Sequence, residues 1–267
     1  MFYNGQQGDE IQIVGKTKSG QLDGALMTAV GLSRFYMPIL ALQMPGLFTN
    51  WSKLESARQA MSAGFKKGVQ DEGFSLLGWS DYGAVHLLSK GFIVRAPGDL
   101  RGKKPFVDRY NPMERVLYQV IGGVTPISLG IPEVLPELNM NAINIVHTSS
   151  VLGEQWQWSS KLDTINKDVS GFVTGGLIIS SKRLNALPSN LSTILLDTGR
   201  VATDSLSKRI RDADDAAFTR LQSKMGVITL TAAEVSQWNT IYKEVHRRLA
   251  QGTFSPDLVA KLEQLAN

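Results

Sequence analysis

The chain has 267 residues, of which 43% are hydrophobic and 19% are charged, a balance typical of a folded globular protein and unlike that of a disordered chain. Its formal net charge of +4 is small and no run of five or six basic residues occurs, so nucleic acid is not an expected partner. The absence of cysteine excludes disulfides and thiolate chemistry, and every apolar stretch ends well short of the roughly 20 residues that a membrane-spanning helix needs.

The N-terminal quarter of the chain is predicted to be mostly helical. The first 20 residues carry polar side chains such as Glu10 where a secretory leader would have its apolar segment. From about residue 21 to residue 79, apolar residues recur at helical spacing, as in Leu54 and Ala57. The turn signal Met44-Pro45-Gly46 separates the predicted elements.

The middle of the chain alternates short apolar runs with longer mixed segments, which predicts strands joined by crossover helices and therefore an α/β fold. Predicted strands cover residues 75–79, 85–88, 105–107, 125–129, 143–146 and 174–180. A helix is predicted over 111–122, with Asn111 as its cap and Pro112 at its first position, and another over 131–140.

After residue 180 the helical spacing returns, and residues 191–225 form an unusually long helical pattern. Residues 226–231 are predicted to be a strand or an extended link, and Thr231 is expected to cap the last helical stretch. The order helical, mixed, helical predicts a discontinuous domain around an inserted one.

Motifs for catalysis, metal binding or nucleotide binding are weak. The three histidines, among them His147, lie far apart and lack the spacing of a metal site. Ser149, His147 and Asp163 could form a triad on paper, but no Gly-x-Ser-x-Gly elbow frames a serine. Gly102-Lys103-Lys104 does not have the spacing of a phosphate loop. We therefore expect a protein without enzymatic activity, metal or cofactor.

Two segments rich in aromatic residues are candidates for binding. Trp79 and Asp81 follow a predicted strand, and the strand ends of open α/β sheets often bind ligands; a capped turn with an aromatic anchor is the alternative. Trp156 and Trp158 stand two residues apart, so a helix cannot bury both on one face. Either one of them lines a pocket, or one is in the core and the other on the surface.

Five short strings occur in a characteristic order and spacing. They are Ser19 to Ala25, Met44 to Phe48, Gly98 to Lys104, Gly123 to Leu138, and Leu187-Pro188. Together they resemble the substrate-binding proteins of TRAP transporters, the DctP-like periplasmic solute receptors. The resemblance implies two α/β lobes, joined by crossing strands and a long helix, that close as a hinge over a small-molecule ligand. It also implies a periplasmic location and delivery of the ligand to the membrane permease subunits of a TRAP-type transporter.

The resemblance also predicts how the chain is divided. Residues 1–85 and 180–225 are expected to form lobe I, and residues 86–179 and 226–267 to form lobe II. The family has a leader, a first strand and a first helix before the stretch that matches Ser19, and all three are expected to be missing here. Lobe I is therefore predicted to be N-terminally incomplete, with Met1 to Asn4 as the remnant of that region.

The chain departs from the family pattern at the residues that bind carboxylates. Phe106 occupies the position of the family's carboxylate-binding arginine, and Val85 that of a second basic residue. The family's Asp and Asn in the next strand and loop fall at Asn144 and Thr148. An arginine fork binds a carboxylate through two charge-assisted hydrogen bonds, which neither phenylalanine nor valine can supply. A simple organic acid is therefore not the expected ligand.

We predict instead a hydrophobic or amphipathic ligand, whose polar end is held by a group such as Asp108 or Thr148. The predicted binding residues are Trp79, Asp81, Val85, Phe106, Asp108, Ile131, Thr148 and Trp156. The alternatives are a receptor for an organic dicarboxylate, an enzyme for small molecules that uses the same cleft, and an incomplete chain that serves only in protein interactions. Phe106 could also simply pack in the second lobe.

Overall fold

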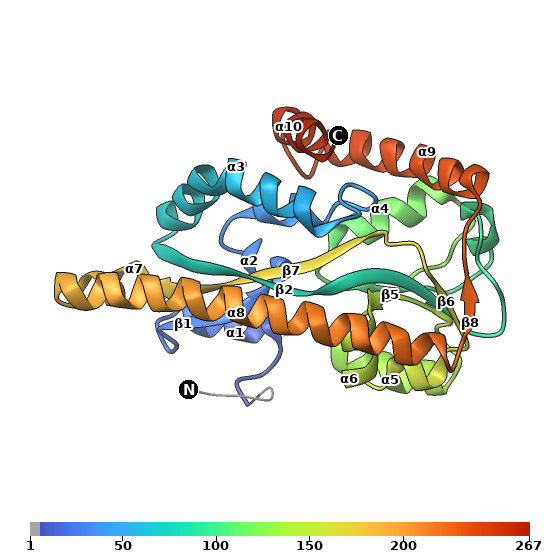
Figure 1. Ribbon diagram of the computed structural model, residues 1–267, viewed down its shortest axis with the longest axis horizontal. Helices are drawn as coiled ribbons and strands as arrows, with labels where there is room; N and C mark the ends of the chain where they lie inside the picture. The colour runs from blue at the N-terminus through green and yellow to red at the C-terminus, as the bar shows by residue number, and fades with distance from the viewer. Residues whose placement is uncertain (1–5) are drawn as a thin grey trace.

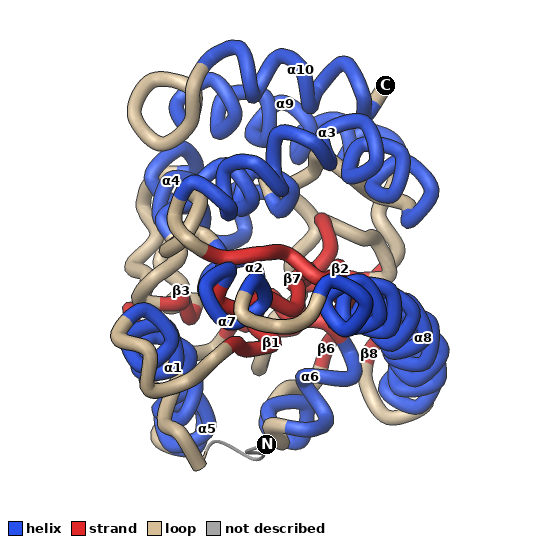
Figure 2. The backbone as a smooth tube through the Cα atoms, turned by 90° about the vertical axis from the view of Figure 1, so that its left-hand side faces the viewer, coloured by secondary structure: helices blue, strands red, loops and turns tan. Residues whose placement is uncertain are grey.

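A mixed sheet lies between helices in the computed structural model, which describes residues 6–267 (Figure 1, Figure 2). The prediction for Met1 to Asn4 therefore lies outside the described residues. The helices are α1 (Glu10–Lys18), α2 (Ala29–Leu32), α3 (Trp51–Asp71), α4 (Pro112–Ile121), α5 (Ile131–Asn139), α6 (Ser150–Gln155), α7 (Ser181–Asn185), α8 (Ser189–Gln222), α9 (Ala232–Leu249) and α10 (Pro256–Ala266), with 3-10 helices η1 (Met37–Gln43), η2 (Pro97–Leu100) and η3 (Trp158–Lys161). Figure 2 shows α3, α4, α9 and α10 on one side of the sheet and α1, α5 and α6 on the other.

Two long strands cross the middle of the main sheet. The strands are β1 (Gly24–Thr28), β2 (Phe74–Ser89), β3 (Phe106–Asp108), β4 (Ile127–Leu129), β5 (Ile145–Ser149), β6 (Thr164–Asn166), β7 (Gly171–Ser180) and β8 (Gly226–Ile228). The main sheet has the order β1-β7-β2-β6-β8, with β5 also paired to β2, while β3 and β4 form a separate parallel pair. β2 and β7 run antiparallel over most of their length and connect the two ends of the molecule.

Helix α8 runs along β2 for much of the long axis of the molecule (Figure 1). Its 34 residues correspond to a length of about 50 Å. The close packing of α8 against β2 depends on small residues, because a Cβ atom added at Gly78 of β2 would stand 2.0 Å from Thr203 Oγ1 of α8. The crossing strands and the long helix confirm the predicted α/β architecture.

Several predicted elements are observed with nearly the predicted bounds. Asn111 caps α4 by accepting a hydrogen bond from Met113 N at 3.0 Å, and Thr231 caps α9 through a capping box with Glu234. The two strands predicted over 75–79 and 85–88 are one continuous strand, β2, which carries two register shifts. Strand β1 lies in the segment that was predicted to be mostly helical.

A helix precedes Ser19, contrary to the prediction that the first helix is missing. Helix α1 begins after Asp9, whose carboxylate accepts a hydrogen bond from Gln12 N at 2.8 Å. The side chain of Gln12 in turn accepts a hydrogen bond from Asp9 N at 2.9 Å, which completes a capping box. The sequence prediction of a missing helix overlooked these local signals, which are those of an ordinary helix start.

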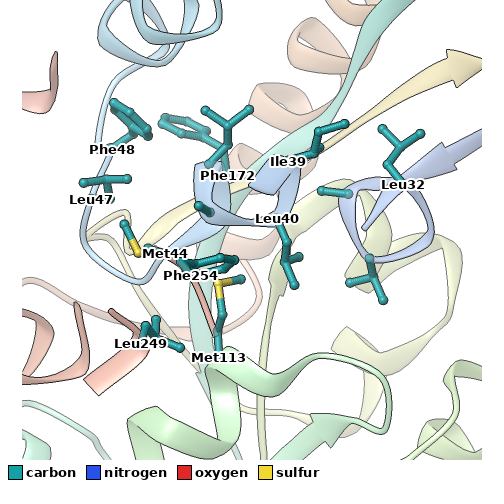
Figure 3. Close-up of a cluster of buried hydrophobic side chains, with 14 of the residues drawn as sticks. Leu32, Ile39, Leu40, Met44, Leu47, Phe48, Met113, Phe172, Leu249 and Phe254 are labelled. Carbon is teal, nitrogen blue, oxygen red and sulfur yellow. The ribbon is translucent and has the colours of Figure 1, made fainter. Parts of the chain in front are cut away.

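The main hydrophobic core joins segments that are far apart in the sequence. Figure 3 shows part of it, formed by Leu32, Ile39, Leu40, Met44, Leu47, Phe48, Met113, Phe172, Leu249 and Phe254. The C-terminal helices therefore pack against the N-terminal third of the chain. Within this arrangement α9 contacts α4, whereas α10 contacts α3 and η1. The C-terminal segment thus touches elements of both predicted lobes, and the lobe boundaries stay a prediction.

Candidate ligand-binding site

One cavity of about 710 Å³ lies between the helices and the ends of several strands. Its lining comes from α1, β1 and the start of α2 together with β2, β3, α4, β5, α6 and β7. The volume lies within the range of roughly 300–1,000 Å³ that is usual for sites of small organic ligands. Segments from both predicted lobes therefore enclose a space that a single small molecule can fill.

Aromatic rings form much of the wall of this cavity. They belong to Tyr82, Phe106, Tyr110, Trp156, Trp158, Phe172 and Tyr242. The rings of Trp156 and Trp158 are stacked with centroids 6.4 Å apart, and Trp158 also meets Phe106 edge to face at 5.7 Å. Gln157 between them has a left-handed backbone with φ of 60°, which breaks the helix and lets both indoles reach the cavity. Both tryptophans therefore line the site, one buried and the other half exposed.

Two carboxyl groups stand close together on the β3–α4 wall. Glu114 Oε2 accepts a hydrogen bond from Asp108 N at 3.0 Å, and Asp108 Oδ1 accepts one from Tyr110 N at 2.8 Å. Burial raises the pKa of Glu114 to about 8, and it also raises the pKa of Asp108 against the lowering effect of Tyr110 N–H and of Arg34. The cavity therefore disfavours negative charge on its own acidic side chains.

A third carboxyl group, that of Glu10, is fully engaged within the protein. Its two oxygens accept hydrogen bonds from Thr28 N at 2.6 Å and from Thr28 Oγ1 at 2.7 Å. Burial raises the pKa of Glu10, and these hydrogen bonds oppose that rise. Glu10 thereby joins α1 to the start of α2 and leaves no donor of Thr28 free for an anionic ligand.

No lysine or arginine side chain of residues 6–267 lines the cavity. Arg34 comes near, with its guanidinium 5.6 Å from the centre of the Tyr110 ring and its Nη2 donating to Tyr110 O at 3.1 Å. It lies behind Tyr110, outside the lining. The described wall of the site is thus aromatic, apolar and acidic.

His147 of β5 also lines the cavity, although it was not among the predicted binding residues. Its Nδ1 lies 3.5 Å from the hydroxyl of Tyr118, a buried residue of α4. Burial lowers the pKa of His147 to about 4, so its imidazole is neutral at physiological pH. It offers the site a neutral hydrogen-bonding group and no positive charge.

The structure brings together six of the eight residues predicted to bind the ligand. They are Val85, Phe106, Asp108, Ile131, Thr148 and Trp156, all of which line the cavity. Phe106 also packs in the core beside the cavity, so the simpler alternative for this residue holds as well. Whether these residues contact a ligand stays a prediction.

Trp79 and Asp81 lie outside the cavity, which corrects their predicted position. They are not at a strand end, because β2 continues through them to Ser89. Asp81 is fully buried and faces Arg58 and Arg211. The ring of Trp79 packs edge to face against Phe65 with centroids 5.7 Å apart. Asp81 thus links both α3 and α8 to the sheet, whereas the Trp79 ring packs against α3.

Several residues of the lining have little signal in the sequence. Glu10 and Glu114 both stand in the first turn of a helix, where acidic residues usually complement the helix dipole on the surface. Tyr82 lies in the aromatic segment that was noticed, but one residue beyond Asp81 on the other face of β2. Only the alternation of side chains along a continuous strand could have singled it out.

Within residues 6–267 no group of three or more His, Asp or Glu side chains is arranged to hold a metal ion. None of the helices in that range combines the length and the apolar composition needed to cross a membrane.

Solved structures of similar fold are periplasmic receptors. A TRAP periplasmic solute binding protein from Shewanella oneidensis with bound succinate shares 15% sequence identity and a TM-score of 0.90, covering 100% of this chain and 87% of that chain. One from Sulfurospirillum deleyianum, also with bound succinate, has 17% identity and a TM-score of 0.88 over 99% and 86% of the two chains. One from Sulfitobacter sp. NAS-14.1 with bound β-D-galacturonate has 16% identity and a TM-score of 0.88 over 98% and 87%. At such identities the likeness shows the fold, and it confirms the two-lobed architecture.

No curated protein matches the chain by sequence. The model of the bacterial extracellular solute-binding proteins of family 7, DctP, matches residues 1–253. This match covers nearly the whole chain, including every element that lines the cavity. The chain therefore belongs to the DctP family of bacterial extracellular solute-binding proteins.

Proposed function

We propose that this receptor captures a hydrophobic or amphipathic small molecule without a carboxylate and delivers it in the periplasm to a TRAP-type permease. Proteins of this family are solute-binding receptors and not enzymes. The observation that carries the proposal is the charge of the cavity: its described lining contains Glu10, Asp108 and Glu114 and no lysine or arginine.

An anionic ligand would be poorly accommodated by this lining. A buried charge is costly unless it is paired and hydrogen-bonded, and removal of one partner of a buried pair costs about 3–5 kcal/mol. A ligand carboxylate would meet Phe106 and Val85 and would lie beside the carboxyl groups of Asp108 and Glu114. An uncharged apolar body would instead gain about 25 cal/mol for each Å² of apolar surface that leaves water.

Ligand capture is expected to close the two lobes. The cavity is lined on one side by residues such as Thr28 and on the other by residues such as Asp108, which belong to different predicted lobes. A ligand that contacts both sides stabilises the closed arrangement, since these contacts are made together only when the lobes meet. The crossing strands β2 and β7 are the proposed hinge, and the closed form is the form proposed to dock on the permease.

An organic carboxylate is the second candidate. It is favoured by the similar structures, which hold succinate, β-D-galacturonate and β-D-glucuronate. In this chain such a ligand would have to recruit Arg34, whose buried Nε has no hydrogen-bond partner among residues 6–267. Recruitment would require the guanidinium to leave its place over the Tyr110 ring and its hydrogen bond to Tyr110 O.

Native mass spectrometry of the protein purified from its own cells tests the proposal. We expect a bound compound that, once released by denaturation, proves to be apolar or amphipathic and to carry no carboxylate. Trp156→Asp should lose this compound, because Trp156 lines the cavity. Met140→Asp is the matched control, since Met140 is 65% exposed and is not part of the lining. Recovery of a dicarboxylate or a sugar acid would establish the second candidate instead.

A further inference from the structure

The four acidic side chains that line the cavity are not equivalent. Asp9 caps α1 and is exposed. Both oxygens of Glu10 accept hydrogen bonds from Thr28. Asp108 accepts a hydrogen bond from Tyr110 and is near the positive charges of Arg34, Arg109 and Arg115, which lower its pKa against the effect of burial. Each of these three carboxyl groups therefore has a partner or a balancing charge within the protein, or is solvated.

Glu114 is different. One of its oxygens, Oε2, accepts the hydrogen bond from Asp108 N, whereas no group of residues 6–267 donates to Oε1. The side chain projects from the first turn of α4 between Met113 and Leu117, which also line the cavity. The charged or titratable groups around it are Asp108 on β3, Tyr118 on the same helix, His147 on β5 and Tyr242 on α9. None of these groups is a cation at neutral pH.

We propose that the ligand carries a protonated amine, or a related organic cation with N–H donors, and that Glu114 receives this group at the inner wall of the cavity. The aromatic rings of the wall support the same chemistry, because the faces of tyrosine and tryptophan attract cations. A carboxylate beside aromatic rings, with no competing lysine or arginine in the described lining, is complementary to an amphipathic cation. The inference rests on the proposed function, since it names the chemical class of the ligand of the same site.

Proton release is expected to accompany binding. Burial raises the pKa of Glu114 to about 8, so its carboxyl group is mostly protonated in the empty cavity at pH 7. A cation beside Glu114 lowers that pKa again, and the carboxyl group gives up its proton as the ligand binds. The affinity for a cation should therefore rise as the pH increases from 6 to about 8. An uncharged ligand that accepts a hydrogen bond from protonated Glu114 would show the opposite trend.

Isothermal titration calorimetry with compounds that differ only in the polar end tests the inference. The probes are phenethylamine, 2-phenylethanol and phenylacetate, and the indole series tryptamine, tryptophol and indole-3-acetate. We expect each amine to bind at least about tenfold more tightly than its alcohol, and to release protons in buffers of different ionisation enthalpy. Glu114→Gln should weaken amine binding about tenfold and remove the preference for each amine over its alcohol. Glu133→Gln, which alters a half-exposed carboxylate outside the lining, is the matched control.

The possible outcomes separate this inference from the proposed function. Amines that bind no better than the alcohols, or not at all, would overturn the inference, and binding of the alcohols would still support a receptor for uncharged amphipathic molecules. Tighter binding of the acids would overturn the inference and the proposed ligand class together. The comparison of the three polar ends uses the unaltered chain, so it stays decisive even if Glu114→Gln fails to fold.

Discussion

Asp81 provides a sharp test, because the sequence suggested a binding residue and the structure shows a buried ion pair. Its side chain is fully buried, and Arg211 Nε donates to Asp81 Oδ2 at 2.8 Å. Arg58 Nη1 lies 2.9 Å from Asp81 Oδ1, in a contact that is electrostatic rather than a well-aligned hydrogen bond. Asp81→Asn would leave the buried guanidinium of Arg58 without a counter-charge, which costs about 3–5 kcal/mol.

Thermal and urea denaturation should show this loss. For a chain of this size about 1 kcal/mol corresponds to roughly 2–4 °C, so we expect the Tm of Asp81→Asn to fall by about 10 °C. Glu55→Gln is the matched control, since it removes the other, more exposed carboxylate on Arg211 and should cost no more than about 1 kcal/mol. Ligand affinity of folded Asp81→Asn should be unchanged. A variant of normal stability that binds poorly would refute the structural role of Asp81.

Three further results are expected. Val85→Arg places a cation in the wall of the cavity. Calorimetry should then show that the variant binds succinate and no longer binds the natural ligand. An unchanged ligand preference would contradict the proposed selection against carboxylates. Gly83→Ala should lower the urea midpoint by an amount equivalent to about 2 kcal/mol. Gly83 has φ of 112°, and the new Cβ would stand 2.5 Å from Asp214 Cγ. Wild-type stability of this variant would show that β2 tolerates a side chain there. Between pH 4.5 and about 8 the folded protein holds a proton on Glu114 that the unfolded chain has lost. This group should therefore lower the free energy of unfolding by up to about 1.4 kcal/mol for each unit of pH increase. A pH dependence of stability that is unchanged in Glu114→Gln would contradict this assignment.

Elements with local signals could be predicted well from the sequence. Helix α4 starts where Asn111 and Pro112 indicate a cap and a first turn, and α9 starts at the capping box of Thr231. These features depend on interactions within four residues, so the sequence alone contains them. Strand β2 was divided in two because its middle contains Ser80, Asp81 and Gly83, residue types that are common in turns. The antiparallel pairing with β7 keeps this stretch extended, and no local signal reveals that partner.

The site could be predicted only in part. Phe106 and Val85 were found because a family pattern assigns cations to their positions, and the cavity indeed has both residues in its wall. Glu114 was not found, because an acidic residue in the first turn of a helix is usually a solvated group. Its burial depends on how α4 packs against β3 and α9, which is a property of the tertiary structure. The same is true of Asp81, whose two arginine partners lie 23 and 130 residues away in the chain.

Titration of the unaltered receptor with succinate tests the central claim most directly. The claim is that a cavity with acidic residues and without lysine or arginine in its described lining does not hold a carboxylate. Isothermal titration calorimetry at pH 7 is expected to show no binding with a Kd below about 1 mM, which corresponds to about 4 kcal/mol of binding free energy. Micromolar binding of succinate would contradict the account and would require a cation, most directly Arg34, to reach the ligand.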